Sequence, residues 1–208
     1  MVIFRFFPVI LIDMARFIFP ILAFILTSEE EIRFAHTYKQ GYDTSCGIAV
    51  TATLLNTYWN IPITEAEMYQ EMILSRYSES DIIYTINFLT ISDYLAQRGI
   101  QSRAYRMDWA ELEDTLGRGF SPIIIHYEKP RPHFALLVHI YGNYAYVADP
   151  AKGFVLLERR QFEKDYSGNV LLSASRTAEK NTERINRIIT EETTRLNRLR
   201  NLSRMRRL

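Results

Sequence analysis

Apolar and polar positions are distributed so unevenly that they divide the chain into three parts. Residues 1–26 are apolar at all but five positions, and the longest charge-free apolar stretch follows Arg16. That stretch has the length of the hydrophobic region of a signal peptide, whereas the full segment crosses a bilayer only if Asp13 and Arg16 are tolerated in it. Because no small-residue cleavage signature follows, we expect residues 1–28 to be a signal or anchor segment, with an uncleaved anchor favoured. An apolar arm packed on its own domain or on a partner is the alternative.

The C-terminal part, residues 176–208, has ten Lys or Arg residues, four Glu residues and neither Gly nor Pro. Apolar side chains recur in it at roughly helical spacing, at Ile185, Ile188, Ile189, Leu196, Leu199 and Leu202. This pattern predicts a long basic amphipathic helix. Three uses are open for it: contact with a membrane surface, contact with nucleic acid, or a solvated helix or tail lying on the rest of the chain, which is acidic overall.

Between these ends, residues 29–175 are predicted to form one globular domain with helices first and strands afterwards. The predicted helices are CGIAVTATLLNTYW after Ser45, a segment opening with a capping box at Thr64, Thr90–Arg98 and Asp108–Leu116. In the first of them, one apolar face is formed by Ile48, Ala52, Leu55 and Trp59. The predicted strands are Ser102–Arg106, SPIIIHYE, HFALLVHI, YAYVAD, GFVLLE and NVLL, with a short helix RQFEKDY before the last. This order predicts an α+β domain with an antiparallel sheet.

Composition excludes several classes of protein. Of the 208 residues, 48% are hydrophobic, and Lys plus Arg (25) nearly balance Asp plus Glu (24). The balance argues against a wholly basic nucleic-acid binder and against an acidic disordered chain. The single cysteine, Cys46, excludes an intramolecular disulfide and any zinc site that needs several thiolates.

Cys46 is the first candidate for chemistry. It falls in the first turn of a predicted helix for which Thr44 and Ser45 are N-cap candidates. Unpaired N–H groups at such a position favour the thiolate over the thiol. A lone cysteine is also common as a small buried apolar residue, so its position alone does not assign it a role.

A thiol nucleophile also needs a base and a group that orients the base. His133 fits best among the four histidines because it opens the strand HFALLVHI, and Asp149 ends the following strand. If an odd, three-residue loop joins these strands, Asp149 lies opposite Ala135 and diagonal to His133, within reach of its Nδ1. A two-residue loop would place Asp149 on the other face. His139 would share the face of His133 but lie roughly 20 Å along the strand.

Four ordered motifs carry a family resemblance. They are QGYDTSCG (Gln40 to Gly47) before an Ala- and Leu-rich helix, then HFALL, VADPAKG and FEKDYSGNVLL, together spanning about residues 36–173. They resemble the bacteriocin-processing cysteine peptidases of cysteine-peptidase family 39, which cleave leader peptides after a Gly-Gly pair. The resemblance implies a papain-like fold, with N-terminal helices that carry the Cys packed on a C-terminal antiparallel sheet that carries the His and Asp.

The same resemblance implies a role for each matching residue. Cys46 is the nucleophile, His133 the general base and acid, Asp149 the residue that orients His133, and Gln40 a side-chain oxyanion donor. Asp149 and Gln40 are both expected at the rim of a cleft rather than in the core. No metal and no organic cofactor is implied.

The sequence also departs from the family pattern. Many members carry an acidic residue just before the Cys and a Pro or Cys soon after it, where this chain has Ser45 and Ile48-Ala49-Val50. The Ser-Cys-Gly form resembles free-standing members encoded without a transporter, such as those that accompany functional-amyloid secretion systems. Residues 86–94 match only weakly a segment that helps to form the substrate cleft in relatives, so the subsite preference stays undefined.

We therefore expect a thiol peptidase that cleaves a leader or precursor peptide and has no nucleic acid among its partners. It would meet its substrate by diffusion or by co-localisation at a membrane, with a separate export system as a partner. We expect it in the cell envelope, with the cytoplasm as the alternative. Two other functions stay open: an acyltransferase or amidase, since the acyl-enzyme is common to all three reactions, and a non-catalytic leader-binding module.

Overall fold

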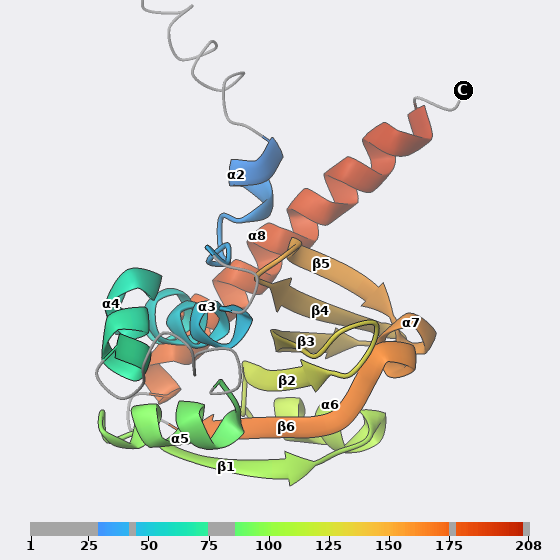
Figure 1. The fold of residues 1–208 in the computed structure, drawn as a ribbon. Coiled ribbons are helices and arrows are strands. Elements are labelled where there is room, and N and C mark those ends of the chain that lie inside the picture. Colours follow the sequence, from blue (N-terminus) through green and yellow to red (C-terminus); the bar gives the residue numbers. More distant parts are fainter. Residues whose placement is uncertain (1–28, 42–44, 75–85, 175–177, 206–208) are drawn as a thin grey trace, which may run out of the picture. The chain divides into compact units, whose positions relative to one another are not determined.

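The domain is built around a six-stranded antiparallel sheet (Figure 1). The structure, a computed structural model, describes residues 29–41, 45–74, 86–174 and 178–205. The strands follow the order β1-β6-β2-β3-β4-β5 across the sheet. They are β1 (Gln101–Arg106), β2 (Ile123–Tyr127), β3 (His133–Tyr141), β4 (Tyr144–Asp149), β5 (Gly153–Glu158) and β6 (Tyr166–Ala174).

Most of the helices precede the sheet in the sequence, which confirms the predicted α+β class. They are α2 (Glu29–Arg33), α3 (Cys46–Ala52) with the π-helical continuation η1 (Thr53–Tyr58), α4 (Glu65–Tyr69) with η2 (Gln70–Leu74), α5 (Phe88–Ala96), α6 (Trp109–Gly117), α7 (Arg159–Asp165) and α8 (Ala178–Met205). The chain divides into two compact units, residues 1–32 and 33–208, and the second contains the sheet.

Apolar side chains pack on both faces of the sheet. On one face, α3, η1, α5 and part of α8 bury a cluster that includes Phe134, Leu136 and Leu171 of the strands. On the other face, Trp109 of α6 and Phe162 of α7 meet edge to face, with ring centroids 5.5 Å apart, over a second cluster. Two layers of helix thus exclude water from both sides of the central strands.

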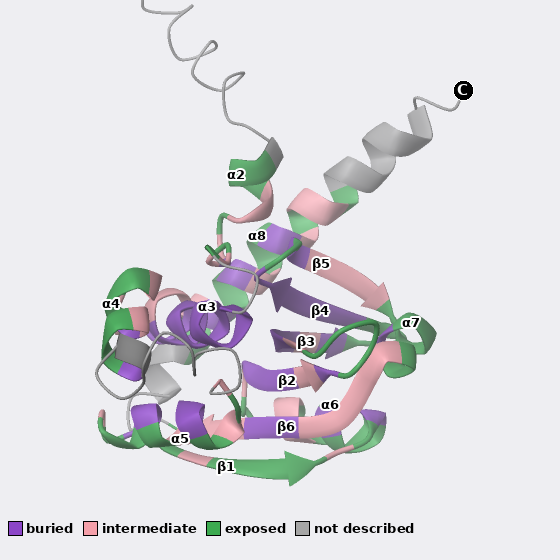
Figure 2. Ribbon diagram, in the orientation of Figure 1, coloured by how far each residue is buried: buried purple, intermediate pink, exposed green. Residues whose placement is uncertain are grey.

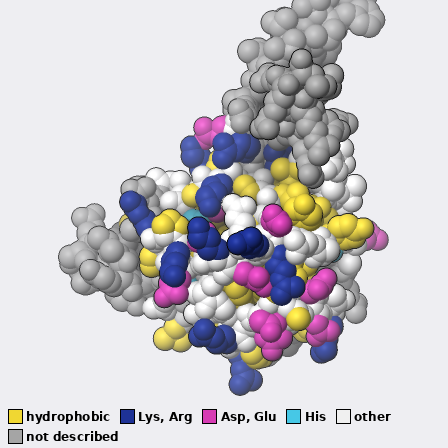
Figure 3. All heavy atoms as spheres, turned by 90° about the vertical axis from the view of Figure 1, so that its right-hand side faces the viewer, with side chains coloured by type: hydrophobic (Ala, Val, Ile, Leu, Met, Phe, Trp, Pro, Cys, Tyr) yellow, Lys and Arg dark blue, Asp and Glu magenta, His cyan; other side chains and the backbone are white. Residues whose placement is uncertain are grey.

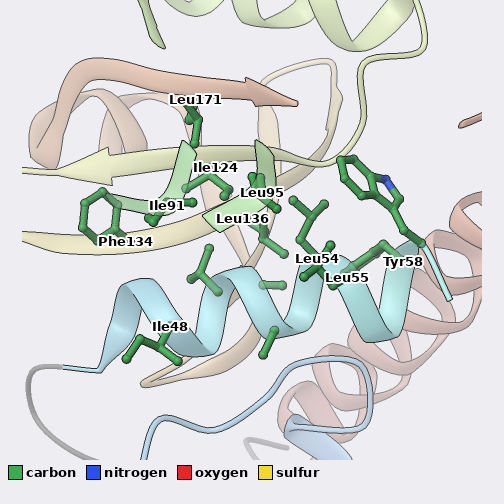
Figure 4. Close-up of a cluster of buried hydrophobic side chains, with 14 of the residues drawn as sticks. Ile48, Leu54, Leu55, Tyr58, Ile91, Leu95, Ile124, Phe134, Leu136 and Leu171 are labelled. Carbon is green, nitrogen blue, oxygen red and sulfur yellow. The ribbon is translucent and has the colours of Figure 1, made fainter. Parts of the chain in front are cut away.

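The helix that carries Cys46 is buried on all sides, and not along one face as predicted (Figure 2). Its apolar side chains belong to the same cluster as those of the strands and α5, and Figure 4 shows Leu54 directed toward Leu95 and Leu136. Its two buried threonines are satisfied within the helix, because Thr51 Oγ1 donates to the Gly47 carbonyl and Thr53 Oγ1 to the Ala49 carbonyl. A helix without a polar face can only form an interior element.

The predicted capping signals have different outcomes. The capping box at Thr64 is confirmed, since Glu67 N–H donates to its Oγ1 and its own N–H donates to the Glu67 carboxylate. Ser45 is the N-cap residue of α3, but its hydroxyl donates to Glu65 Oε1 at 2.7 Å and does not cap the helix. The other N-cap candidate, Thr44, lies outside the described residues.

The predicted odd loop between β3 and β4 is wrong, although the register inferred from it is right. Tyr141 pairs with Tyr144, so the loop has two residues, and the register shifts between Leu137 and His139. Beyond that bulge Leu136 pairs with Ala148, which places Asp149 opposite Ala135. A bulge in one strand supplies the extra residue that the loop was expected to contain.

The bulge also changes the face on which His139 lies. His139 pairs with Tyr146, a member of the first buried cluster, and their ring centroids are 5.8 Å apart. His133 pairs with Tyr127, which belongs to the second cluster. The prediction that these two histidines share a face is therefore wrong.

The C-terminal segment forms the predicted long helix, α8, and part of it packs on the domain. Ile185 and Ile188 are buried there, and Ile189 and Leu196 are partly buried against the same cluster. Arg184 donates to the main-chain carbonyls of Asn56 and Thr57 at the end of η1. The sequence left three uses open for this helix. Its described side chains contact the rest of the chain, which is one of the three.

Within the described residues, no helix is both long enough and apolar enough to cross a bilayer. The predicted signal or anchor segment, residues 1–28, lies outside that part of the chain.

Candidate active site

Cys46 begins α3 next to the first two residues of β3. Its sulfur accepts hydrogen bonds from the His133 side chain and from the backbone N–H groups of Phe134 and Gly47. The residue is 9% exposed, so substrate reaches its sulfur over a small area. The helix start and the strand start, distant in sequence, are thus joined at one atom.

His133 links Cys46 to Asp149. Its Nε2 lies 2.9 Å from Asp149 Oδ1, which leaves Nδ1 as the nitrogen available to Cys46. The prediction that Asp149 reaches Nδ1 is therefore wrong. The imidazole stacks on Tyr127 of β2, with ring centroids 6.5 Å apart and planes 12° apart, and this stacking fixes the plane of the ring.

Asp149 lies in the interior, 1% exposed, and not at a rim as expected. Its Oδ1 also accepts from the N–H groups of Ala151, at 2.8 Å, and Lys152, at 3.2 Å, which belong to the turn between β4 and β5. Lys152 Nζ lies 3.5 Å from Oδ2. The turn that follows the strand folds back over the carboxylate, and this closure removes it from water.

These contacts shift the pKa of each of the three groups in the direction that favours its charged form. Burial alone would raise the pKa of Cys46, but the hydrogen bonds to His133 and to the backbone bring it below the ordinary thiol value. Burial would lower the pKa of His133, but Asp149 and Cys46 outweigh it and raise that pKa to about 9. Burial also opposes ionisation of Asp149, whose pKa is nevertheless lowered, chiefly by His133. The shifts at Cys46 and His133 both favour a thiolate beside an imidazolium over the neutral pair.

Gln40 lies close to Asp149 and His133. Its backbone N–H donates to the Pro150 carbonyl at 3.0 Å, which holds it beside the residue that follows Asp149. Gln40 and His133 line one cavity of about 290 Å³. Of the four residues singled out in the sequence, Cys46, His133 and Asp149 are thus linked in series, and Gln40 lines a cavity with His133.

Two glycines of the sequence motifs are required by close packing. A Cβ on Gly47 would lie 2.3 Å from Ile86 Cγ2 and 3.2 Å from a ring carbon of Phe134. Gly153 has φ +77°, and a Cβ there would lie 2.3 Å from the Arg33 carbonyl oxygen. Both sites exclude a side chain, and Gly153 also needs a backbone conformation that L-residues disfavour.

Two groups of aromatic contacts at the site were missed in the sequence. Tyr127 stacks on His133, and a second group forms where Phe88 and His126 both contact Phe134, at centroid distances of 5.2 and 5.1 Å. The strands SPIIIHYE and HFALLVHI follow one another in the sequence, and an antiparallel pairing of the two would have placed Tyr127 near His133. Phe88 lies on a separate helix, and no local pattern connects it to this strand.

The described residues contain no group of three or more His, Cys, Asp or Glu side chains placed to hold a metal ion.

A thiol, a histidine and a buried carboxylate linked in this order, at the junction of a helix and a sheet, are typical of a cysteine peptidase with a papain-like fold. The model of the Peptidase C39 family matches residues 35–178. The chain belongs to the Peptidase C39 family.

Two curated relatives agree with this family. A protein of Pseudomonas aeruginosa described as a "probable functional amyloid protease FapD" is 32% identical over 145 residues, which cover 69% of this chain and 62% of the relative. The protein of that description from Pseudomonas fluorescens is 28% identical over 146 residues, with the same coverage of both chains. The chain therefore spans less than two thirds of the length of these relatives.

Two solved structures share the fold at low sequence identity. A double glycine motif protease from an AMS/PCAT transporter, solved with the leader peptide, has a TM-score of 0.55 and 24% identity, over 66% of this chain and 89% of that chain. The peptidase domain of Streptococcus ComA, a bifunctional ABC transporter, has a TM-score of 0.56 and 19% identity, over 68% of this chain and 98% of that chain.

Proposed function

We propose that this protein is a thiol peptidase that cleaves a leader or precursor peptide after a Gly-Gly pair. The observation that carries the proposal is the connected series Cys46–His133–Asp149, in which a buried carboxylate holds an imidazole against a thiol of lowered pKa. An ion pair of this kind is expensive to maintain in the interior. Nucleophilic catalysis requires such a pair, whereas the packing of the domain does not.

In the proposed mechanism, the Cys46 thiolate attacks the scissile carbonyl carbon and forms a C–S bond. Gln40 Nε2 and the Cys46 backbone N–H donate hydrogen bonds to the oxygen as it gains negative charge. The C–N bond then breaks, and the His133 imidazolium gives its proton to the leaving amine. A water molecule next gives a proton to His133 and attacks the thioester, which breaks the C–S bond and releases the acid.

Gly-Gly specificity is supported by how little room surrounds the sulfur. Cys46 is 9% exposed, and Ile86 and Phe134 press against the adjacent helix turn at Gly47. A residue without a side chain next to the scissile carbonyl suits such a site. The structural neighbour solved with its leader peptide is a double glycine motif protease, and the curated relatives add a functional-amyloid context for the precursor.

The experiment compares the wild-type protein with Cys46→Ala and Cys46→Ser on synthetic peptides in which Gly-Gly is followed by three randomised residues. We expect wild type alone to produce cleavage after Gly-Gly, detected by mass spectrometry of new termini. Small precursors secreted by cells that carry wild type or Cys46→Ala provide the matching test in vivo. Cleavage by Cys46→Ala at the wild-type rate would overturn the proposal.

Equal amounts of released amine and released acid identify hydrolysis. An excess of amine over acid in the presence of an added amine acceptor would instead identify an acyltransferase. Peptide binding with no product from any peptide would identify a leader-binding module.

We also propose the predicted organisation of the chain: an anchor at residues 1–28, the peptidase domain at 29–175 and the basic helical tail at 176–208, with the enzyme held at the cell envelope. The apolar character of the first segment supports this arrangement. Attachment would raise the local concentration of an enzyme that meets an exported precursor at the same membrane.

A further inference from the structure

The cavity beside His133 has a definite position relative to the proposed reaction. Its lining comes from Gln40, the end of β2, the loop between β2 and β3, the turn between β4 and β5, the end of β5, and α7. His133 gives its proton to the leaving amine in the proposed mechanism. Because His133 also lines the cavity, the part of the substrate that follows the scissile bond would leave beside it.

Three basic side chains and one carboxylate give the lining its charge. Lys129 and Arg131 come from the exposed β2–β3 loop, Lys152 comes from the β4–β5 turn, and Asp165 comes from the end of α7. Lys152 is partly engaged, because its Nζ lies 3.5 Å from Asp149 Oδ2. Figure 3 shows a group of Lys and Arg side chains in the middle of the face that lies at the right-hand side of Figure 1.

The electrostatics of this cavity favour a negative side chain. The negative charge of Asp149 is balanced by His133, whose pKa is raised to about 9. The lining therefore presents more positive than negative charge to a substrate. Lys129 and Arg131 are exposed, so salt screens a charge pair that either of them makes with the substrate.

We propose that this cavity is a specificity site for an acidic side chain at the first or second position after the scissile bond. The inference rests on the proposed peptidase function, because it uses the direction in which the leaving group departs. Lys129 and Arg131 are the residues that determine the preference. The site selects the start of the mature product, whereas Gly-Gly recognition acts on the end of the leader.

The test measures kcat/KM on three peptides that carry Glu, Gln or Lys directly after Gly-Gly. We expect the Glu peptide to exceed the Lys peptide by about 10-fold at low salt, and the ratio to fall as ionic strength rises. The double substitution Lys129→Glu/Arg131→Glu should reverse the order. Arg103→Glu/Arg118→Glu makes the same change in net charge on exposed residues outside the cavity and should keep the wild-type order.

Thermal melting of both double variants verifies that they fold, and the ratio between peptides is the readout. A Glu-to-Lys ratio near 1 in wild type, or an equal change in both double variants, would overturn the inference. Binding of the same peptides to Cys46→Ala, measured by fluorescence anisotropy, separates the two proposals. Preferential binding of the Glu peptide without cleavage by wild type refutes the peptidase function and retains the site, whereas cleavage without a charge preference retains the peptidase and refutes the site.

Discussion

The charge on Cys46 depends on a single proton that it shares with His133. Burial disfavours the thiolate, as it disfavours any charge removed from water. The thiolate therefore exists only while His133 and the N–H groups of Phe134 and Gly47 keep their positions. The rate at which the Cys46 thiol reacts with an alkylating agent therefore measures whether these three groups are in place.

We expect iodoacetamide to label Cys46 with a pH midpoint below the ordinary thiol value of about 8.5. In His133→Ala, burial remains while the charge and the hydrogen bond are lost, so the midpoint should rise above 8.5. The measurement is the labelling rate against pH, followed by mass spectrometry. A wild-type midpoint at the ordinary value would show that the thiol is not activated.

Asp149→Asn should move the upper pH limit of cleavage to lower pH. Asp149 is a principal cause of the raised pKa of His133, so cleavage should fall above about pH 9 in wild type and earlier in the variant. The folded-state pKa of His133 lies above its ordinary value of 6.5. The contribution of the His133–Asp149 contact to the stability of the fold is therefore fully present below pH 6.5 and is lost as pH rises through about 9.

Because Asp149 is buried and accepts three hydrogen bonds, the same substitution should also lower the free energy of unfolding, by about 1–2 kcal/mol. The pH–rate profile and urea denaturation measure the two effects. If the profile of Asp149→Asn matches that of wild type, a different residue orients His133.

Gln40→Ala should separate oxyanion stabilisation from thiolate formation. The Gln40 amide acts only once the carbonyl oxygen gains charge, so we expect kcat to fall on the order of 10²–10³-fold. The alkylation rate of Cys46 should stay at the wild-type value. Gln97→Ala, at an exposed position after α5, is the control and should keep the wild-type rate. Wild-type cleavage by Gln40→Ala would remove this residue from the proposed mechanism.

At the scale of elements, α8 is joined to the segment that carries Gln40 through the buried carboxylate of Glu192. Glu192 is 1% exposed, and its carboxylate lies 2.8 Å from His36 Nδ1 and 2.6 Å from Arg195 Nε. Arg195 also donates to the Phe154 carbonyl of β5. Through Arg195 and Glu192, α8 therefore contacts both β5 and the segment that contains His36 and Gln40.

Glu192→Ala should lower the free energy of unfolding by about 3 kcal/mol, because it leaves His36 and Arg195 without their buried partner. The neighbouring Glu191 is a matched control, since its carboxylate also lies 3.2 Å from His36 but is 51% exposed. Glu191→Ala should change the free energy by less than about 1 kcal/mol. Equal losses in urea denaturation would show that burial of Glu192 does not determine how α8 is held.

At the scale of the whole molecule, the two ends of the chain are predicted to act differently at a membrane. Deletion of residues 1–28 should release the protein from membranes at any salt concentration, because apolar attachment is insensitive to screening. Deletion of residues 198–208 removes five arginines but keeps the packed part of α8, and should weaken only salt-sensitive attachment. Sedimentation with membranes at low and high salt measures both. Full-length protein that stays entirely in the supernatant at low salt would contradict this prediction.

The sequence by itself determined the features that depend on neighbouring residues. The order of helices and strands, the capping box at Thr64, and Cys46 at a helix start follow from periodicity and from side chains a few residues apart. His133 at the start of one strand and Asp149 at the end of the next were likewise readable, because each strand is a continuous apolar run.

Only the tertiary structure decided the features that depend on residues far apart in the chain. A bulge after Leu137, rather than an odd loop, aligns Asp149 with His133, since register follows from the packing of both strands and not from loop length alone. The burial of Asp149 and Glu192, and the stacking of His133 on Tyr127, depend on elements that meet only in the folded chain. Local sequence encodes which element forms, whereas the water excluded when elements meet decides which side chains become buried, charged and reactive.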